Sequence, residues 1–256
     1  MFNYQISHLN RYGQNVGAET KTPAFFKFPI QPMLGRWVKV IPFAEIEDEP
    51  NIFRTLWRAI EREDNDKAWT YLPYERFTKP EFLENSIRAN FGYSYGSQYV
   101  VQVGHQTLGW LGLINPRLED RIIEIGNVFF SDQLKQTTAA TEAIFLVLED
   151  CFNHGFRKVE WRCNDLNEAG INAAVRFGFL YEGTLRQDKV IKGLNCNTAC
   201  FSILDEEWKL IRLAFLDWLK QDNFDIDRQQ KVALEEFMKL YPLFGREEDE
   251  AVLETA

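Results

Sequence analysis

The sequence is poor in the residues that build covalent or metal frameworks, because its 256 residues include only four cysteines and three histidines. No two cysteines have Cys-x-x-Cys spacing, so we expect no structural zinc site and no metal. A chain of this length can bury a core without disulfide bonds, which favours a reducing compartment. The opening MFNYQISHLN has neither a basic nor an apolar region, so no signal peptide is expected. These features predict a cytoplasmic protein.

Positive charge and long apolar runs are also scarce. The chain carries 29 Lys and Arg against 38 Asp and Glu, a net charge of -9. A broad nucleic-acid-binding face needs clustered cations, so none is expected. No apolar run is long enough for a membrane span. Acidic clusters at 45–49 and 247–250 fit a solvated loop and tail, or a rim that attracts a cationic amine.

Apolar and aromatic residues are plentiful, with 45% hydrophobic residues that include 21 Phe and 7 Trp. This composition suits one large globular domain with appendages. We expect an N-terminal arm over 1–34, a main domain over 35–208, a helical extension over 209–245 and a disordered acidic tail over 246–256. The extension could cap a cleft of the main domain or form a homodimer contact, and the sequence does not choose between them.

Periodicity predicts the secondary structure. Strands are expected at 36–42, 98–103, 107–114 and 121–130, the second and third joined as a hairpin. Helices are expected at 50–62 and 80–89, and later at 205–220 and 228–240. A second hairpin is expected from strands 179–191 and 197–204.

The middle of the chain carries the clearest pattern. Apolar residues from Ala140 to Phe152 recur at helical spacing, and Gly155 follows where a helix cap belongs. A strand at 156–163 and a short helix at 168–177, ended by Gly178, come next. The strand–helix–strand unit requires a right-handed crossover between parallel strands. The order of elements predicts a mixed α/β (α+β-like) domain.

Two helix starts could bind a phosphate-bearing ligand. The segment VFFSDQLKQTTAATEA leads from a strand into a helix whose first residues are small, and a helix N-terminus offers unpaired N–H groups. Asn167 precedes the helix at 168–177. Thr and Asn also cap helices for purely structural reasons, and this alternative stays open at both places.

The order of these segments, followed by RKVEWRCNDLNEA, RFGFLYEGTLRQ and FSILDEEW, resembles the GNAT superfamily of N-acetyltransferases. Within it, the pattern is similar to the branch that acetylates ribosomal-protein N-termini. The resemblance covers about residues 34–208. It implies the GNAT acyl-CoA N-acyltransferase fold, with a mostly antiparallel central sheet, a parallel splayed strand pair and flanking helices.

The resemblance also implies that acetyl-CoA is the co-substrate. The pantetheine arm would bind backbone at Val128 and Phe130, the pyrophosphate would sit on the loop from Lys135, and Asn167 would bond the arm. The implied acetyl-CoA site comprises Val128, Phe129, Phe130, Lys135, Gln136, Thr137, Thr138, Ala139, Ala140, Thr141 and Asn167.

Four positions depart from the family pattern. Lys135 replaces Gln or Arg, and Thr138 replaces the central glycine of the phosphate loop. Gly170 stands where the branch has Ser, and Ala174 where many members have a Tyr that protonates the leaving thiolate. These departures motivate an alternative function, a catalytically degenerate GNAT-like binding or structural module.

Acetyl transfer needs a base for the amine and a pocket for the acceptor. Glu124, on the strand that leads to the splay, is the candidate base; an ion-paired strand carboxylate is the alternative. Trp69, Tyr71, Tyr74 and Trp110 could line the pocket, or could be core aromatics. The acceptor would be a primary amine, either a cationic small molecule or a protein N-terminus.

Overall fold

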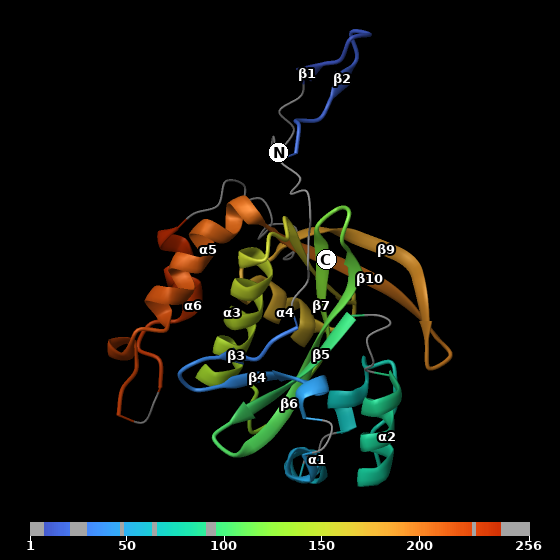
Figure 1. Cartoon of the computed structure of the whole chain (residues 1–256), viewed down its shortest axis with the longest axis vertical. Helices are drawn as coiled ribbons and strands as arrows, with labels where there is room; N and C mark the ends of the chain where they lie inside the picture. The colour runs from blue at the N-terminus through green and yellow to red at the C-terminus, as the bar shows by residue number, and fades with distance from the viewer. Residues whose placement is uncertain are drawn as a thin grey trace.

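A computed structural model describes residues 8–20, 30–46, 49–62, 66–90, 96–226 and 229–241. Within these residues one sheet contains eight strands, in the order β3-β4-β5-β6-β7-β8-β10-β9 (Figure 1). The strands are β3 (Met33–Leu34), β4 (Lys39–Pro42), β5 (Gly96–Val103), β6 (Gln106–Arg117), β7 (Ile122–Phe130), β8 (Lys158–Asn164), β9 (Leu180–Ile191) and β10 (Leu194–Leu204). Among these strands β7 and β8 run parallel and the other neighbours antiparallel.

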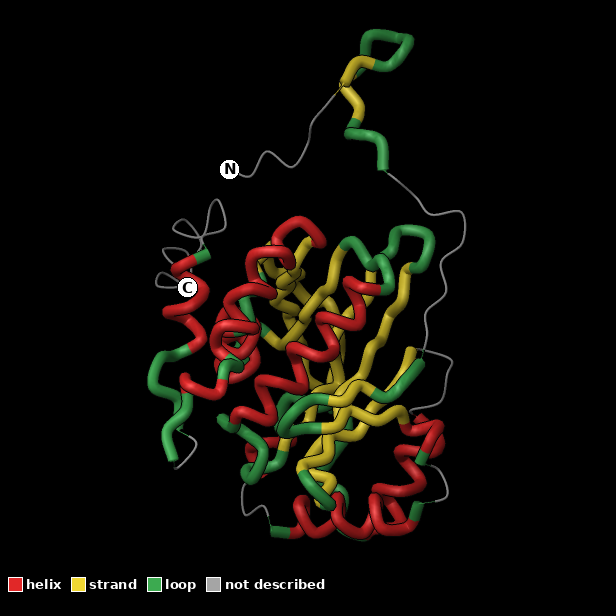
Figure 2. Tube along the Cα trace, turned by 60° about the vertical axis from the view of Figure 1, so that its left-hand side comes forward, coloured by secondary structure: helices red, strands yellow, loops and turns green. Residues whose placement is uncertain are grey.

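Helices cover both faces of the sheet (Figures 1 and 2). The helices are α1 (Pro50–Glu61), α2 (Pro80–Asn90), α3 (Thr138–Asn153), α4 (Glu168–Arg176), α5 (Asp205–Trp218) and α6 (Leu234–Leu240). One core joins β5–β8 and β10 to buried residues of α3 to α6. A smaller core on the other face packs α1 and α2 against Val100, Trp110 and Phe129. The mixed α/β architecture predicted from the sequence is confirmed.

The N-terminal part divides into two pieces. β1 (His8–Leu9) and β2 (Asn15–Val16) form a separate two-stranded hairpin, which Figure 1 draws apart from the main sheet. Residues 30–38 instead run along α3. The buried carboxylate of Glu142 accepts hydrogen bonds from the backbone N–H groups of Arg36, Trp37 and Val38 at 2.7, 2.7 and 3.1 Å. Helix α3 is thereby fixed to this segment.

The C-terminal helices share the main core with the sheet. Ala214 and Phe215 of α5 and Leu234 of α6 are fully buried there. The predicted helix at 228–240 was too long, because α6 begins at Leu234. The Asn223 side chain donates to Val232 O and accepts from Val232 N, so the backbone before α6 pairs with residue 223 instead of coiling. The predicted tail at 246–256 lies outside the described residues.

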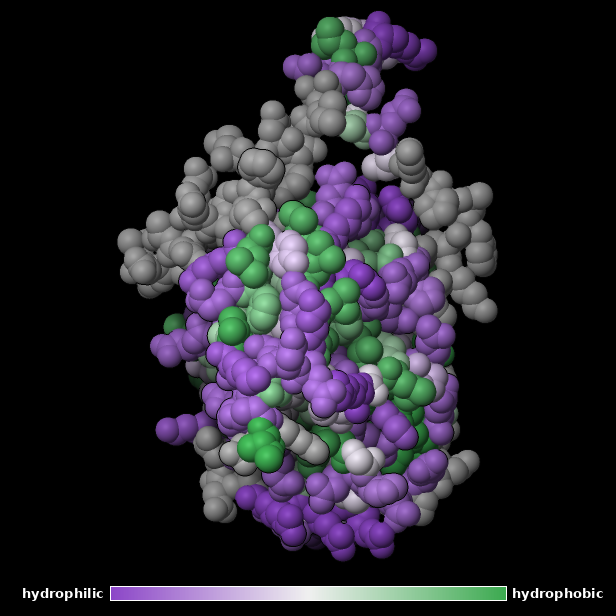
Figure 3. All heavy atoms as spheres, turned by 90° about the vertical axis from the view of Figure 1, so that its left-hand side faces the viewer, coloured by the Kyte–Doolittle hydropathy of each residue, from purple (hydrophilic) through white to green (hydrophobic). Residues whose placement is uncertain are grey.

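The helical side of the molecule has a mixed surface. Figure 3 shows apolar side chains emerging in small groups between hydrophilic ones. Leu210, Leu213 and Leu216 of α5 are partly exposed. Over the described ranges, no helix has the length and apolarity needed to cross a bilayer. The same residues contain no group of His, Cys, Asp and Glu arranged to hold a metal ion.

Candidate active site

The two parallel strands separate halfway along their length. Cα pairing runs from Ile122 and Lys158 to Ile125 and Trp161, although β7 continues to Phe130 and β8 to Asn164. Just beyond the last pair, β7 has one extra residue relative to β6. Asn127 there adopts a left-handed φ of 49°, which marks a β-bulge. A bulge bends its strand, and beyond it β7 no longer pairs with β8. We call the unpaired stretch between the two strands the gap.

Helix α3 begins just after β7 ends, through a loop that contains the predicted phosphate-binding residues. Thr137 caps the helix: its hydroxyl accepts from Ala140 N at 3.2 Å and donates to Leu134 O at 2.7 Å. The capping alternative therefore holds for Thr137. Within the described residues the N–H groups of Thr138 and Ala139 have no hydrogen-bond partner. These two amides can receive a phosphate.

The remaining loop residues differ in their exposure. Lys135 is exposed and forms an ion pair with Asp132 at 2.9 Å, and Gln136 is exposed with a left-handed φ of 59°. Ala139 and Ala140 are buried but small. The buried Thr141 hydroxyl accepts from Arg176 Nη1 at 3.0 Å. Thr141 thus serves helix packing, whereas Lys135, Gln136 and Thr138 remain accessible.

Asn167 caps α4 at the edge of the same gap, accepting from Gly170 N at 3.1 Å. A Cβ placed on Gly170 would lie 2.7 Å from Asn167 Nδ2 and 3.2 Å from the Cβ of Cys163. Because Gly170 has no side chain, the Asn167 side-chain amide can occupy the space that a Cβ would take. Ala174, where the family resemblance expects a Tyr, is fully buried in the main core and offers no acid.

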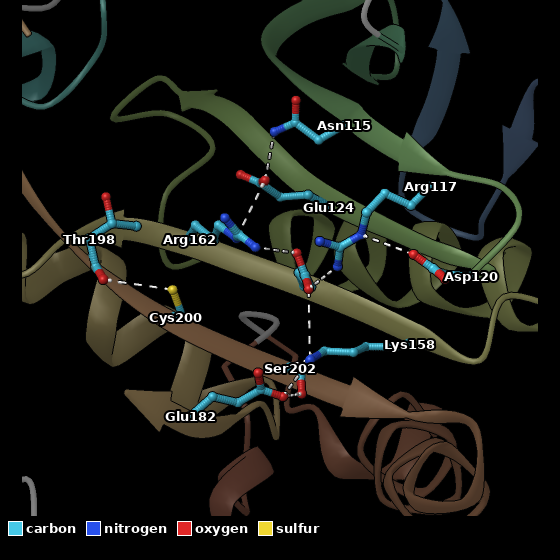
Figure 4. Close-up of polar contacts among 11 residues, drawn as sticks. Asn115, Arg117, Asp120, Glu124, Lys158, Arg162, Glu182, Thr198, Cys200 and Ser202 are labelled. Carbon is cyan, nitrogen blue, oxygen red and sulfur yellow. Dashed lines mark hydrogen bonds and ion pairs between the residues drawn. The ribbon is translucent and has the colours of Figure 1, made fainter. Parts of the chain in front are cut away.

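Glu124 lies on β7 just before the bulge, on the sheet face opposite α3, and is 4% exposed. Its Oε2 accepts from Asn115 Nδ2 at 2.8 Å and lies 3.9 Å from Arg162 Nε (Figure 4). Its Oε1 makes no hydrogen bond within the described residues. Burial raises the pKa of Glu124, while the Asn115 hydrogen bond and Arg162 lower it less. A carboxylate of this kind has one oxygen held and one available to take a proton.

A charged network surrounds Glu124 on this face. Glu160 is its partner across the parallel pair, and two adjacent carboxylates would repel one another. Cations offset that repulsion, because Glu160 pairs with Arg117 at 2.6 Å and Arg162 at 2.9 Å, and lies 3.7 Å from Lys158. The network, drawn in Figure 4, fixes the Arg162 side chain beside Glu124.

The four predicted pocket aromatics occupy two layers. Trp69 and Trp110 are 2% and 0% exposed and pack against Phe129 in the smaller core, as expected of core aromatics. Tyr74 is partly buried, and its hydroxyl accepts from Trp110 Nε1 at 3.1 Å and donates to Asn127 Oδ1 at 2.7 Å. Tyr71 is 38% exposed. The two tyrosines therefore lie nearer the solvent than the two tryptophans.

The loop that carries these aromatics is attached to both sides of the gap. Tyr71 donates its hydroxyl proton to Leu166 O at 2.7 Å, next to Asn167. Lys192, at the tip of the β9–β10 hairpin, donates to Trp69 O at 2.7 Å and lies 3.5 Å from Glu75. Lys192 and Gly193 have φ of 52° and 77°, as a tight two-residue hairpin turn requires. The hairpin tip is thus bonded to the loop.

The sequence reasoning missed Asn115, Asn127, Arg162 and Lys192. A signal for Asn127 existed, because a Gly-Asn pair inside a strand pattern is typical of a bulge. Arg162 and Lys192 gave no such signal, since their roles depend on partners far away in the sequence.

Comparison with known proteins agrees with this geometry. The family model described as an acetyltransferase (GNAT) domain matches residues 39–180. The chain therefore belongs to the GNAT acetyltransferase family. A search of curated proteins gave no match.

Solved structures extend the likeness. The chain is 30% identical to a GCN5-related N-acetyltransferase from Brucella melitensis, covering 84% of this chain and 99% of that one, with a TM-score of 0.77. It is 36% identical to a probable GNAT-family acetyltransferase from Chromobacterium violaceum, covering 76% and 98%, with a TM-score of 0.67. A ribosomal L7/L12 α-N-protein acetyltransferase solved with coenzyme A shares the fold at 15% identity, covering 69% and 99%, with a TM-score of 0.56.

Proposed function

We propose that this protein transfers the acetyl group of acetyl-CoA to a primary amine, either a small cationic molecule or a protein N-terminus. The observation that carries the proposal is the gap between β7 and β8, which opens between the start of α3 and Glu124. A substrate thioester in this gap would have phosphate-binding amides at one end and a candidate base at the other. The coenzyme A complex of the structurally similar ribosomal-protein acetyltransferase supports the choice of donor.

The residues present fit acetyl-CoA in three places. The β7 backbone beyond Ile125, including Val128 and Phe130, stays paired with β6 but no longer pairs with β8, so its β8 side can bond the pantetheine amides as a neighbouring strand would. The free N–H groups of Thr138 and Ala139 at the start of α3 can bind the pyrophosphate, with Lys135 nearby. Asn167 lies at the opposite edge with its Nδ2 group available to the arm.

Glu124 supplies the proton acceptor in this account. An amine is protonated at neutral pH, and Glu124 takes that proton directly or through a water molecule. The neutral amine then attacks the thioester carbonyl, forming a C–N bond and a tetrahedral intermediate whose nitrogen carries one extra proton. Backbone N–H groups at the gap stabilise the oxyanion. The C–S bond then breaks, the sulfur leaves as a thiolate, and the nitrogen gives up its extra proton to solvent.

Transfer to the amine is direct. Burial raises the pKa of the Cys163 thiol to about 12 and also raises that of Cys200. Both thiols stay protonated at neutral pH and are poor nucleophiles, so neither favours an acetyl-cysteine intermediate. With no tyrosine at position 174, the leaving thiolate is protonated by solvent.

The test is an acceptor screen with acetyl-CoA. The protein is incubated with small amines and N-terminal peptides, while thiol release is followed and acetylated products are identified by mass spectrometry. The proposal predicts thiol release that depends on one class of amine. Saturable acetyl-CoA binding with no transfer to any acceptor would instead support the degenerate binding module.

A further inference from the structure

The bulge in β7 is held by a chain of side-chain hydrogen bonds that crosses three strands. Trp110 Nε1 donates to the Tyr74 hydroxyl at 3.1 Å, and that hydroxyl donates to Asn127 Oδ1 at 2.7 Å. Asn127 Nδ2 donates in turn to Gln98 Oε1 at 3.2 Å. Both ends of the Asn127 amide are therefore occupied at the residue where β7 departs from β8.

Two glycines make room for this chain. Gln98 on β5 lies opposite Gly112 on β6, which lies opposite Gly126 on β7. A Cβ on Gly112 would overlap the Gln98 side-chain amide, so the bare glycine lets that side chain pass over β6 toward Asn127. A Cβ on Gly126 would meet Ile114 Cδ1 and lie 3.2 Å from Glu124 Oε1. The two glycines in the row Gln98–Gly112–Gly126 therefore leave the space in which the Gln98 side chain reaches Asn127.

The environment of Tyr74 keeps its hydroxyl a donor. Tyr74 packs between Trp69 and Phe77, with ring centroids 6.2 and 5.4 Å away. Burial raises the pKa of Tyr74, more than its hydrogen bonds to Trp110 and Asn127 lower it. Burial therefore keeps the phenol protonated, so that its hydroxyl can donate to Asn127 Oδ1.

We infer that Tyr74 and Asn127 are positioning residues, which hold the β7 bulge and so fix the backbone of Val128 where the substrate thioester must bind. The inference rests on the proposed function. Asn127 has a left-handed backbone, which Gly and Asp also tolerate. Of these three residues only Asn has a side-chain amide, which can accept a hydrogen bond at its oxygen and donate one from its nitrogen. Loss of this tether leaves the bulge in place and makes it mobile.

The test compares Tyr74→Phe, Asn127→Gly and the double variant. Glycine keeps the left-handed φ accessible, so Asn127→Gly removes the tether without straining the backbone. Each single change is expected to lower kcat/KM for acetyl-CoA by about tenfold to a hundredfold, as misplacement of reacting groups does. Since both residues act through one hydrogen bond, the double variant is expected to be no worse than the poorer single variant.

Tyr241→Phe is the matched control. It removes a phenol that donates to Asp217 Oδ2 at 2.6 Å in the C-terminal extension, away from β7. Its activity is expected to equal that of the unaltered protein. Single reductions that multiply in the double variant, or equal those of Tyr241→Phe, would overturn the inference.

A second readout does not require acetyl transfer. Amide hydrogen exchange across residues 126–130 is expected to quicken in Tyr74→Phe and Asn127→Gly but not in Tyr241→Phe, with thermal unfolding showing all three folded. Unchanged exchange in both site variants would also overturn the inference. If exchange quickens but the unaltered protein acetylates no amine, the proposed function fails and the tether at the bulge stands.

Discussion

The surroundings of Glu124 suit it to the role of base proposed for it. Its strand position places it beside the bulge, and its burial places a carboxylate where ionisation is costly. The hydrogen bond from Asn115 and the nearby Arg162 moderate that cost without using the second oxygen. The ion-pair alternative and the base hypothesis thus describe the same side chain, and kinetics must separate them.

Replacing Glu124 by Gln tests its role as base. Activity of the unaltered protein is expected to rise with pH as Glu124 loses its proton, at a pH above the ordinary glutamate pKa of 4.5, because burial raises its pKa. Glu124→Gln is expected to lower kcat by about a hundredfold and to remove this rising limb. Glu149→Gln, which changes an acid paired with Arg212 elsewhere on the molecule, is the control. An unchanged pH–rate profile in Glu124→Gln would show that Glu124 is not the base and has only a structural role.

The same raised pKa predicts an effect on stability. The folded state binds the Glu124 proton more tightly than the unfolded state, so its contribution to stability is present below pH 4.5 and is lost as pH rises through the folded pKa. Glu124→Gln, which cannot ionise, should therefore gain stability relative to the unaltered protein as pH increases. Urea unfolding at several pH values measures the difference, and a difference that shrinks with pH would be contrary to this account.

Gly170 offers a residue-scale test of the proposed acetyl-CoA site. A Cβ at this position would displace the Asn167 amide. Gly170→Ala is therefore expected to raise the KM for acetyl-CoA about fivefold, equivalent to one hydrogen bond of about 1 kcal/mol. The value of kcat should remain unchanged. Gly17→Ala is the control, because a Cβ at Gly17 would contact no other atom. Equal KM values for the two variants would show that Asn167 does not contribute to acetyl-CoA binding.

At the scale of elements, helix α3 depends on a clamp from outside itself. Glu142 accepts three backbone N–H groups of the N-terminal segment. A glutamine would turn an amide donor toward those donors, so Glu142→Gln is expected to cost about 3 kcal/mol of unfolding free energy. Glu149→Gln on the same helix breaks a more exposed pair with Arg212 and should cost less than about 1 kcal/mol. Chemical denaturation measures both free energies of unfolding. Equal losses in the two variants would show that the Glu142 hydrogen bonds do not hold α3 in this way.

The elements that the sequence predicted well are those whose signals are local. Helix α3 follows from its apolar spacing, and the hairpin of β9 and β10 from its turn. The helix predicted at 228–240 failed because Asn223, a residue outside it, bonds Val232. In the site, the positions of Glu124 and Asn167 could be predicted from strand and cap patterns. The burial of Trp69 and Trp110 could not be predicted, because aromatic side chains are common both in cores and in binding pockets.

At the scale of the whole molecule, the C-terminal helices complete the core under the sheet. Phe215 packs against Phe145 of α3 and Phe177 beyond α4, with ring centroids 5.5 and 6.3 Å apart. A chain that ends at Trp208, the predicted domain boundary, would expose these aromatics to water. It is expected to lose cooperative thermal unfolding.

A chain that ends at residue 245, after the predicted extension, is the control for this truncation and should unfold as the full chain does. Calorimetry distinguishes the two. A cooperative transition in the shorter chain would show that residues 209–245 are a dispensable appendage.

We propose above all that the gap between β7 and β8 binds acetyl-CoA for transfer to an amine. Isothermal titration of the full chain with acetyl-CoA measures that binding. Saturable binding of one acetyl-CoA per chain is expected, and weaker binding by Gly170→Ala. An absence of binding heat at acetyl-CoA concentrations of about 1 mM, where even weak complexes of roughly −4 kcal/mol form, would contradict it.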